Sequence, residues 1–295
     1  MIDKLETMSQ PKEVALSGYF LSRIVVATDF TDVEQDASSV CQAMGSVVRS
    51  GKASVYSGDD GQTVACLPVW QDQELRSIVG FICSPSEPTP MGVMEVWSPR
   101  GQYRDLALSG GHFGKLERFQ NVSSFVRFEK GSGLPGQAWD AGRAIIHNDL
   151  KNHPGFLRAA GASAESLNLA LGIPTFYGEH SETMVLIGSE ATPLARSIQV
   201  WVPDGSSATL QDSVSASGAV SASGAVSALR TAAAAGKGSG PGNEPANAER
   251  PATVPALVQK CLDSGDAELQ DGKEAAVAIP SYAHGKLSSI VVLAF

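Results

Sequence analysis

The stretch at residues 131–150 combines glycines with polar side chains that can bind a ligand. It runs GSGLPGQAWDAGRAIIHNDL, with Gly131, Gly133 and Gly136 around Pro135. Glycine-rich loops can hold phosphates, but no GK[ST] follows, and this excludes a P-loop. Glycine also permits sharp turns, and proline is favoured in the first turn of a helix. We therefore predict a structural turn that leads from a strand into a short helix.

The segment that begins within this stretch and runs on to residue 158 supplies the candidate ligand-binding residues, His147, Asp149, Asn152 and Arg158. Carboxylate, amide and guanidinium groups can fix a polar ligand by directional hydrogen bonds. Alternatively, Asp149 and Asn152 cap the next helix, and Arg158 is a solvated or salt-bridged surface residue. The sequence leaves both interpretations open.

Other chemistry finds little support in the sequence. It contains no GxSxG or HExxH motif, so we expect no catalytic residue and no enzymatic activity. Histidines and methionines are not clustered as metal ligands, so no metal and no cofactor are expected. Cys41, Cys66, Cys83 and Cys261 form no CxxC pair and lie in apolar runs. This pattern indicates buried, reduced thiols in a cytoplasmic protein.

Composition narrows the range of partners. The chain has 295 residues, 43% of them hydrophobic, and a net charge of −9. An acidic protein repels phosphate backbones and anionic lipids, so we expect neither nucleic acid nor membrane as a partner. No apolar run approaches the roughly 20 residues that span a bilayer, and the first residues contain no apolar segment typical of a secretory signal.

A repeat organises the elements around these residues. The stretches TVACLPVWQDQELRSIVGFIC, ALGIPTFYGEHSETMVLIGS and AVAIPSYAHGKLSSIVVLAF share a frame, and their prolines, Pro68, Pro174 and Pro280, are 106 residues apart each time. Each stretch predicts a β-hairpin with a longer, polar loop. A candidate helix that ends at a glycine precedes each one, at Gly51, Gly142 and Gly265.

The copies differ in completeness. The string MEVWSP, from Met94, returns as IQVWVP, from Ile198. The first copy is predicted to lack this tryptophan-bearing strand, because its position would fall before residue 1. The second copy alone has a full set of upstream strands, at GVMEVWSP, RDLALSG and SSFVRFEKG.

The middle copy resembles a GAF domain, over about Gly92 to Pro193. The resemblance rests on MEVWSPRGQYRDLAL, on FVRFEKGSGLPGQAWDAGRAIIHNDL, on the Gly-Ile-Pro strand and on TMVLIGSEATP. It implies an α+β fold of GAF-like antiparallel sheets with helices packed on one face, in repeated GAF-like units. The family binds a small molecule or mediates dimerisation, so a homodimer is compatible with the resemblance. The cysteine-based, NKFDE and bilin signatures of the family are absent from the middle copy.

The predicted domain map follows from the repeat. Residues 1–92 form a partial GAF-like unit, 93–197 a GAF-like domain, and 198–205 with 254–295 a partial third unit. Residues 206–253 are rich in Ala, Ser, Gly and Pro and contain SASGAV twice, which predicts a disordered low-complexity linker.

Three functions remain as hypotheses. We expect a non-enzymatic GAF-type sensor in signal transduction that binds an unknown small molecule or a signalling protein. The alternative is a degenerate GAF interaction scaffold without a ligand. A third hypothesis is a thiol-dependent enzyme resembling the methionine-sulfoxide reductases, with Cys66 and Cys83 reacting together.

Overall fold

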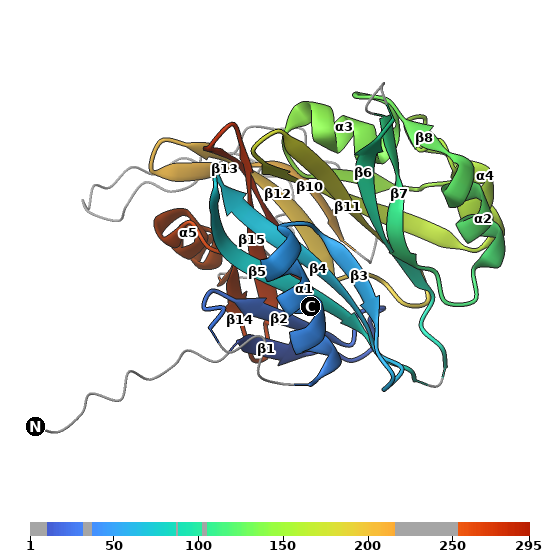
Figure 1. Cartoon of the computed structure of the whole chain (residues 1–295), viewed down its shortest axis with the longest axis horizontal. Coiled ribbons are helices and arrows are strands. Elements are labelled where there is room, and N and C mark those ends of the chain that lie inside the picture. The colour runs from blue at the N-terminus through green and yellow to red at the C-terminus, as the bar shows by residue number, and fades with distance from the viewer. Residues whose placement is uncertain (1–10, 32–36, 87, 102–104, 216–252) are drawn as a thin grey trace, which may run out of the picture.

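The computed structural model describes residues 11–31, 37–86, 88–101, 105–215 and 253–295. In these ranges the chain forms three sheets in which all strand pairs are antiparallel, with helices against them (Figure 1). The predicted α+β class with antiparallel sheets is therefore confirmed. None of the described helices is long and apolar enough to cross a membrane.

Each sheet is formed by one continuous part of the chain. We call these parts the N-terminal, middle and C-terminal units. The N-terminal unit comprises β1 (Lys12–Ala15), β2 (Arg23–Ala27), α1 (Ser39–Ser50), β3 (Ser54–Ser57), β4 (Thr63–Gln71) and β5 (Glu74–Cys83). The middle unit comprises β6 (Gly92–Arg100), β7 (Asp105–His112), α2 (Glu117–Phe125), β8 (Arg127–Phe128), α3 (Gly133–Ala141), β9 (Ile145–Asn148), α4 (Ala159–Ala164), β10 (Leu167–Tyr177) and β11 (His180–Ser189). The C-terminal unit comprises β12 (Ser197–Asp204), β13 (Ser207–Ser215), α5 (Thr253–Ser264), β14 (Glu268–Gln270), β15 (Ala276–Ala283) and β16 (Lys286–Ala294).

The strand orders of the three sheets correspond. They are β1-β2-β5-β4-β3, β8-β7-β6-β11-β10-β9 and β13-β12-β16-β15-β14. In each sheet, the repeated proline belongs to a row of paired residues that crosses three adjacent strands. The rows are Ala27–Ile78–Pro68, Trp97–Thr183–Pro174 and Trp201–Ile290–Pro280. That the three units are copies of one repeat stays a prediction.

The structure corrects two predictions about the flanking units. The N-terminal unit does have the strand that corresponds to β6, namely β2, but Ala27 stands where Trp97 and Trp201 stand. Its outer strand, β1, also precedes the inner strand in the chain, whereas the outer strands β7 and β13 follow theirs. For these two reasons the sequence of the N-terminal unit did not reveal the strand that corresponds to β6. The C-terminal sheet also has five strands, because residues 207–215 form β13. The predicted linker 206–253 is wrong at both ends, because β13 covers 207–215 and α5 begins at Thr253. The rest of it, 216–252, lies outside the described residues.

The repeated prolines occupy one kind of position. In each unit the edge strand ends its pairing two residues before the proline, at Cys66, Gly172 and Ala278. A proline has no N–H to donate, so it fits where the neighbouring strand has stopped. The hairpins themselves close with two-residue turns, between Gln71 and Glu74, Tyr177 and His180, and Ala283 and Lys286. The predicted longer loops are wrong, because the residues after each proline stay paired up to the two-residue turn.

The central core lies between the three sheets. Leu67, Ile173 and Ile279, each directly before a repeated proline, are at most 1% exposed and belong to one apolar cluster. The opposite faces of the sheets pack against helices: α1 on the first, α2 to α4 on the second and α5 on the third (Figure 1). Strands buried on both faces explain the near-continuous apolar runs.

Equivalent hydrogen bonds join the units in a ring. The backbone N–H of Ala53 donates to Glu182 Oε2 (2.8 Å), that of Ala144 to Ser289 Oγ (3.2 Å), and that of Ala267 to Ser77 Oγ (3.0 Å). Each alanine follows a helix-ending glycine by two residues, and each acceptor comes directly before the residue that pairs with a repeated proline. The first unit thus donates to the second, the second to the third, and the third to the first.

Candidate functional site

Arg158, a predicted ligand-binding residue, is buried in the middle unit. Its side chain is 1% exposed and forms a bidentate ion pair with Glu95, which is fully buried. Arg158 Nη2 donates to Glu95 Oε2 at 2.8 Å, and Nη1 donates to Glu95 Oε1 and, at 2.6 Å, to Ser123 Oγ. The alternative of a surface residue is wrong, because α2 and the segment before α4 cover this guanidinium.

Aromatic rings surround the same guanidinium. Its carbon lies 4.6–5.8 Å from four ring centroids, those of Trp97, Phe119, Phe128 and Phe156. Trp97 also donates from Nε1 to Glu95 Oε2 at 3.0 Å. The space between the middle sheet, α2 and the segment before α4 therefore holds a side-chain ion pair of the protein itself.

The flanking units lack this pair. In the C-terminal unit, Gln199 takes the position of Glu95 and accepts the indole N–H of Trp201 at 3.1 Å. In the N-terminal unit the position is Val25. Glu95 was missed at the sequence level, although its place two residues before the repeated tryptophan was a usable signal.

His147 lies on β9 and is 2% exposed. Its Nε2 contacts Gln137 Oε1 at 2.9 Å, and its ring stacks on His153 with centroids 3.8 Å apart. Burial, reinforced by the neighbouring His153, lowers the pKa of His147 to about 3. His147 is therefore a neutral residue packed within the middle unit.

Asp149 and Asn152 bond to each other. The Asn152 amide donates to Asp149 Oδ2 at 2.9 Å, and the Asn152 backbone N–H donates to the Asp149 carbonyl at 2.9 Å. Helix α4 begins at Ala159 with no side-chain cap, so the helix-capping interpretation is wrong. The structure brings His147 and Arg158 into the interior, whereas Asp149 and Asn152 form an exposed turn.

The glycines of the GSGLPG stretch sit at a tight strand-to-helix connection. Gly131 and Gly133 have φ of +83° and +61°, and α3 begins at Gly133. A Cβ at Gly136 would lie 2.1 Å from the Glu129 carbonyl oxygen. Pro135 is in the first turn of α3, and its carbonyl accepts from Thr183 Oγ1 at 3.2 Å.

Cys66 and Cys83 lie on opposite faces of the first sheet. Cys66 belongs to the cluster under α1, whereas Cys83 belongs to the central core. Burial raises the pKa of Cys66 and raises the pKa of Cys83 to about 11. The predicted joint reaction of these thiols is therefore contradicted, because the sheet separates them and neither is poised as a thiolate.

A cavity lies where the three hairpins end; we call it the hairpin-tip cavity. Its volume is about 600 Å³. All three hairpins and the region of α3 contribute to its wall. The first hairpin supplies Trp70, Asp72 and Gln73, the second Phe176 and Gly178 to Ser181, and the third Tyr282 to Gly285. Lys130 and Trp139 to Gly142 complete the wall at α3. The sequence does not predict this cavity, because it exists only when the three tips meet.

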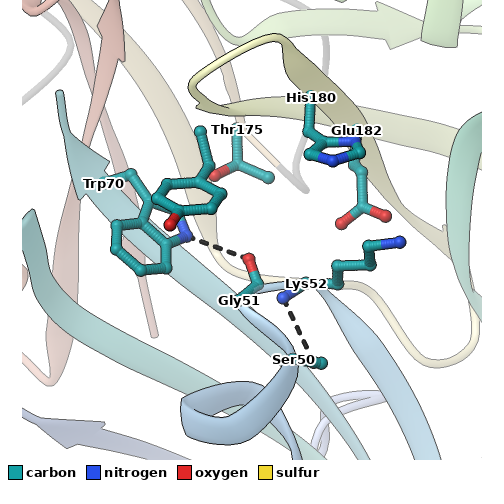
Figure 2. A pocket seen from close by; sticks show the side chains of 8 residues that line it. Ser50, Gly51, Lys52, Trp70, Thr175, His180 and Glu182 are labelled. Atoms are coloured by element: carbon teal, nitrogen blue, oxygen red, sulfur yellow. Dashed lines mark hydrogen bonds between the residues drawn. The ribbon is translucent and has the colours of Figure 1, made fainter. Parts of the chain in front are cut away.

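A second, small cavity of about 80 Å³ shares Trp70 and His180 with the first. Figure 2 shows Trp70 on one side of it and Lys52 with Glu182 on the other. Glu182 is 8% exposed and accepts from Ala53 N and, at 2.7 Å, from Ser98 Oγ. Serine is the acceptor at the other two inter-unit hydrogen bonds, Ser289 and Ser77, so Glu182 is the one acceptor of the three that is a carboxylate.

No protein-family model and no curated protein matches this chain. Among solved structures it is similar to free methionine-R-sulfoxide reductase from Neisseria meningitidis, with 16% identity, 35% of this chain and 53% of that chain covered, and a TM-score of 0.27. It is also similar to a nitrate-site mutant of NreA from Staphylococcus aureus, with 16% identity, 37% of this chain and 81% of that chain covered, and a TM-score of 0.29. A third similar structure is the GAF domain of a phosphoenolpyruvate-protein phosphotransferase from Coxiella burnetii, with 19% identity, 34% of this chain and 57% of that chain covered, and a TM-score of 0.28.

The chain thus spans about half the length of the reductase, and GAF domains are among the structures it resembles. At these TM-scores the likenesses carry no argument about function. Among the described residues, no group of three or more His, Cys, Asp or Glu side chains could hold a metal ion.

Proposed function

We propose that this chain is a non-enzymatic regulatory protein that binds a small molecule in the hairpin-tip cavity. The observation that carries the proposal is the convergence of the three hairpin tips on one cavity of about 600 Å³. Ligand pockets usually measure about 300–1,000 Å³ and combine aromatic walls with a few polar groups. Trp70, Trp139, Phe176 and Tyr282 supply the aromatic part here.

The cavity's position supports a regulatory role. A ligand there would touch all three units at once, so binding would stabilise their mutual arrangement by mass action. The space between the sheet and the helices of the middle unit is a weaker candidate for a ligand site, because Glu95 and Arg158 already pair with one another there.

A substitution that fills the cavity tests this function. Ala141 is exposed on α3 and lines the cavity, so Ala141→Trp would occupy part of its volume. Ala256→Trp is the matched control, because Ala256 is exposed on α5 and is not part of the cavity wall. A ligand-detected NMR screen of small polar and aromatic compounds should give binders to the wild type and the control that Ala141→Trp loses. No binders, or equal binding to Ala141→Trp, would refute the proposal.

The second candidate function is an interaction scaffold. Val122 and Phe125 lie three residues apart on α2 and are 42% and 82% exposed, so they present apolar surface on one face. Native mass spectrometry of protein from its own host separates the two functions. A bound small molecule that Ala141→Trp loses supports the ligand-binding function. A bound protein that Phe125→Ser loses supports the scaffold.

A further inference from the structure

We propose that the outer surface of α2 and of the segment before α4 binds an acidic, amphipathic segment of a partner protein. We call this surface the α2 patch; it comprises Arg118, Val122, Phe125, Arg127 and Leu157. The two helices lie next to each other on the helix-covered face of the middle sheet (Figure 1). The inference rests on the second candidate function, whose partner class it names, and it is independent of the hairpin-tip cavity.

The α2 patch gathers exposed hydrophobic side chains. Of the five large hydrophobic side chains that are exposed among the described residues, three belong to it, namely Val122, Phe125 and Leu157. Val122 and Phe125 share one face of α2. Leu157 directly precedes Arg158, which donates to Ser123 Oγ of α2 at 2.6 Å, so the segment that carries Leu157 packs against α2. Exposed apolar side chains that lie together mark interaction sites.

The charges beside these side chains are positive. Arg118 stands four residues before Val122, which places it on the same face of α2, and Arg127 follows the end of the helix. Neither arginine forms an ion pair with a described residue. The sequence of α2 has one acidic residue, Glu117, and it does not share this helical spacing. In a chain of net charge −9, such a surface favours a partner that supplies carboxylates.

Arg127 is ordered in a way that suits a carboxylate. Its Nη1 donates to the carbonyl oxygen of Val126 at 2.9 Å and to that of Ser124 at 3.3 Å. These bonds hold the exposed guanidinium at the end of α2, and its Nε and Nη2 have no partner among the described residues. An arginine can bind a carboxylate through two parallel N–H donors, and prior ordering lowers the entropic cost of that contact.

Charge also decides between this partner and two others. In a two-fold symmetric dimer the patch would face its own copy, so Arg118 and Arg127 would meet like charges. An anionic membrane would attract the patch, but the net charge of −9 would repel the rest of the chain from it. A short acidic segment with apolar side chains meets both the cations and the hydrophobic residues without either penalty.

Two synthetic peptides test the inference on the full chain. Acetyl-DELFDELL-amide is acidic and amphipathic, whereas acetyl-NQLFNQLL-amide has nearly the same shape without the side-chain charges. Single exposed ion pairs contribute little, but two or three together predict that the acidic peptide binds at least roughly fivefold more tightly in NMR titrations. Added salt should remove most of this preference, because it screens exposed charges.

Variants place the binding on the α2 patch. Phe125→Ser should weaken the binding of both peptides, whereas Val48→Ser, at an exposed position on α1, should not. Arg118→Glu should abolish the preference for the acidic peptide. Lys273→Glu changes the net charge by the same amount at an exposed position before β15 and should retain the preference.

A preference for the acidic peptide that Arg118→Glu abolishes, together with binding that Phe125→Ser weakens and both controls retain, supports the inference. Equal binding of the two peptides, binding of neither, or binding that Phe125→Ser leaves unchanged overturns it. Binding to phosphatidylserine vesicles in place of the peptide overturns it in favour of a membrane, and self-association that Phe125→Ser abolishes overturns it in favour of a second copy.

The inference and the proposed functions fail separately. The Ala141→Trp screen reports on the cavity alone. Native mass spectrometry detects a bound protein whatever its charge, so a protein lost in Phe125→Ser together with equal binding of the two peptides would keep the scaffold function and overturn the acidic partner class.

Discussion

Arg158 and Glu95 are 63 residues apart in the chain and form a bidentate ion pair in the interior of the middle unit, with side chains 1% and 0% exposed. Pairing and hydrogen bonding offset the cost of removing both charges from water, and the surrounding rings favour the guanidinium further. Loss of one partner leaves the other charge buried alone.

We expect Arg158→Ala to lower the free energy of unfolding by about 3–5 kcal/mol. Denaturant titration measures this. The double variant Glu95→Leu/Arg158→Met should be much closer to the wild type, because no unpaired charge remains. If the double variant is as unstable as the single one, packing around these residues matters more than charge pairing.

The ring of inter-unit hydrogen bonds predicts different effects for two substitutions of Glu182. Glu182→Ala removes the acceptor of the Ala53 N–H and should cost about 1–3 kcal/mol. Glu182→Ser should cost less, because serine accepts the equivalent bond at Ser289 and Ser77. Thermal unfolding with Ser289→Ala as a matched comparison tests this. Identical losses for Glu182→Ala and Glu182→Ser would contradict it.

Gly133 and Gly205 separate backbone strain from steric clash. Both have positive φ, +61° and +63°, so Gly→Ala should cost about 1–2 kcal/mol at either. At Gly133 the added Cβ would also lie 2.4 Å from the Phe128 ring, whereas nothing lies within 4 Å at Gly205. Gly133→Ala should therefore lose roughly 1–3 kcal/mol more than Gly205→Ala in chemical denaturation. Equal losses would show that the site relaxes.

His147 should make stability depend on pH. Its pKa is lowered to about 3 in the folded protein, whereas the unfolded value is about 6.5. Above about pH 6.5 the ring is neutral in both states and its contribution is fully present. As pH falls from 6.5 towards 3, only the unfolded state gains the proton, so stability falls by up to about 1.4 kcal/mol per pH unit.

Denaturant titrations between pH 7 and pH 4 measure that slope. We expect His147→Asn to reduce the slope, whereas His180→Asn, at an exposed hairpin residue, should retain it. An unchanged slope in His147→Asn would assign the pH dependence to other groups.

Local features of the fold were predictable from the sequence. The alternation of apolar runs and turns predicted the repeated hairpins, and glycines at 51, 142 and 265 marked helix ends because each adopts a positive φ. The turn at Gly133 likewise follows from residue type, since few other residues adopt its backbone conformation. Such features depend on neighbours in the chain.

Tertiary structure alone decided which residues meet. The apolar runs of β5 and β16 have two buried faces, and their sequences do not state which face meets a helix and which meets another sheet. The pairing of Glu95 with Arg158, the separation of Cys66 from Cys83 and the meeting of the hairpin tips all follow from that choice. Sequence by itself thus determined the three repeated hairpins, the helix ends and the repeat frame. The packing of three sheets around one core decided the interior ion pair and the cavity, because contacts between distant segments depend on which buried faces stack.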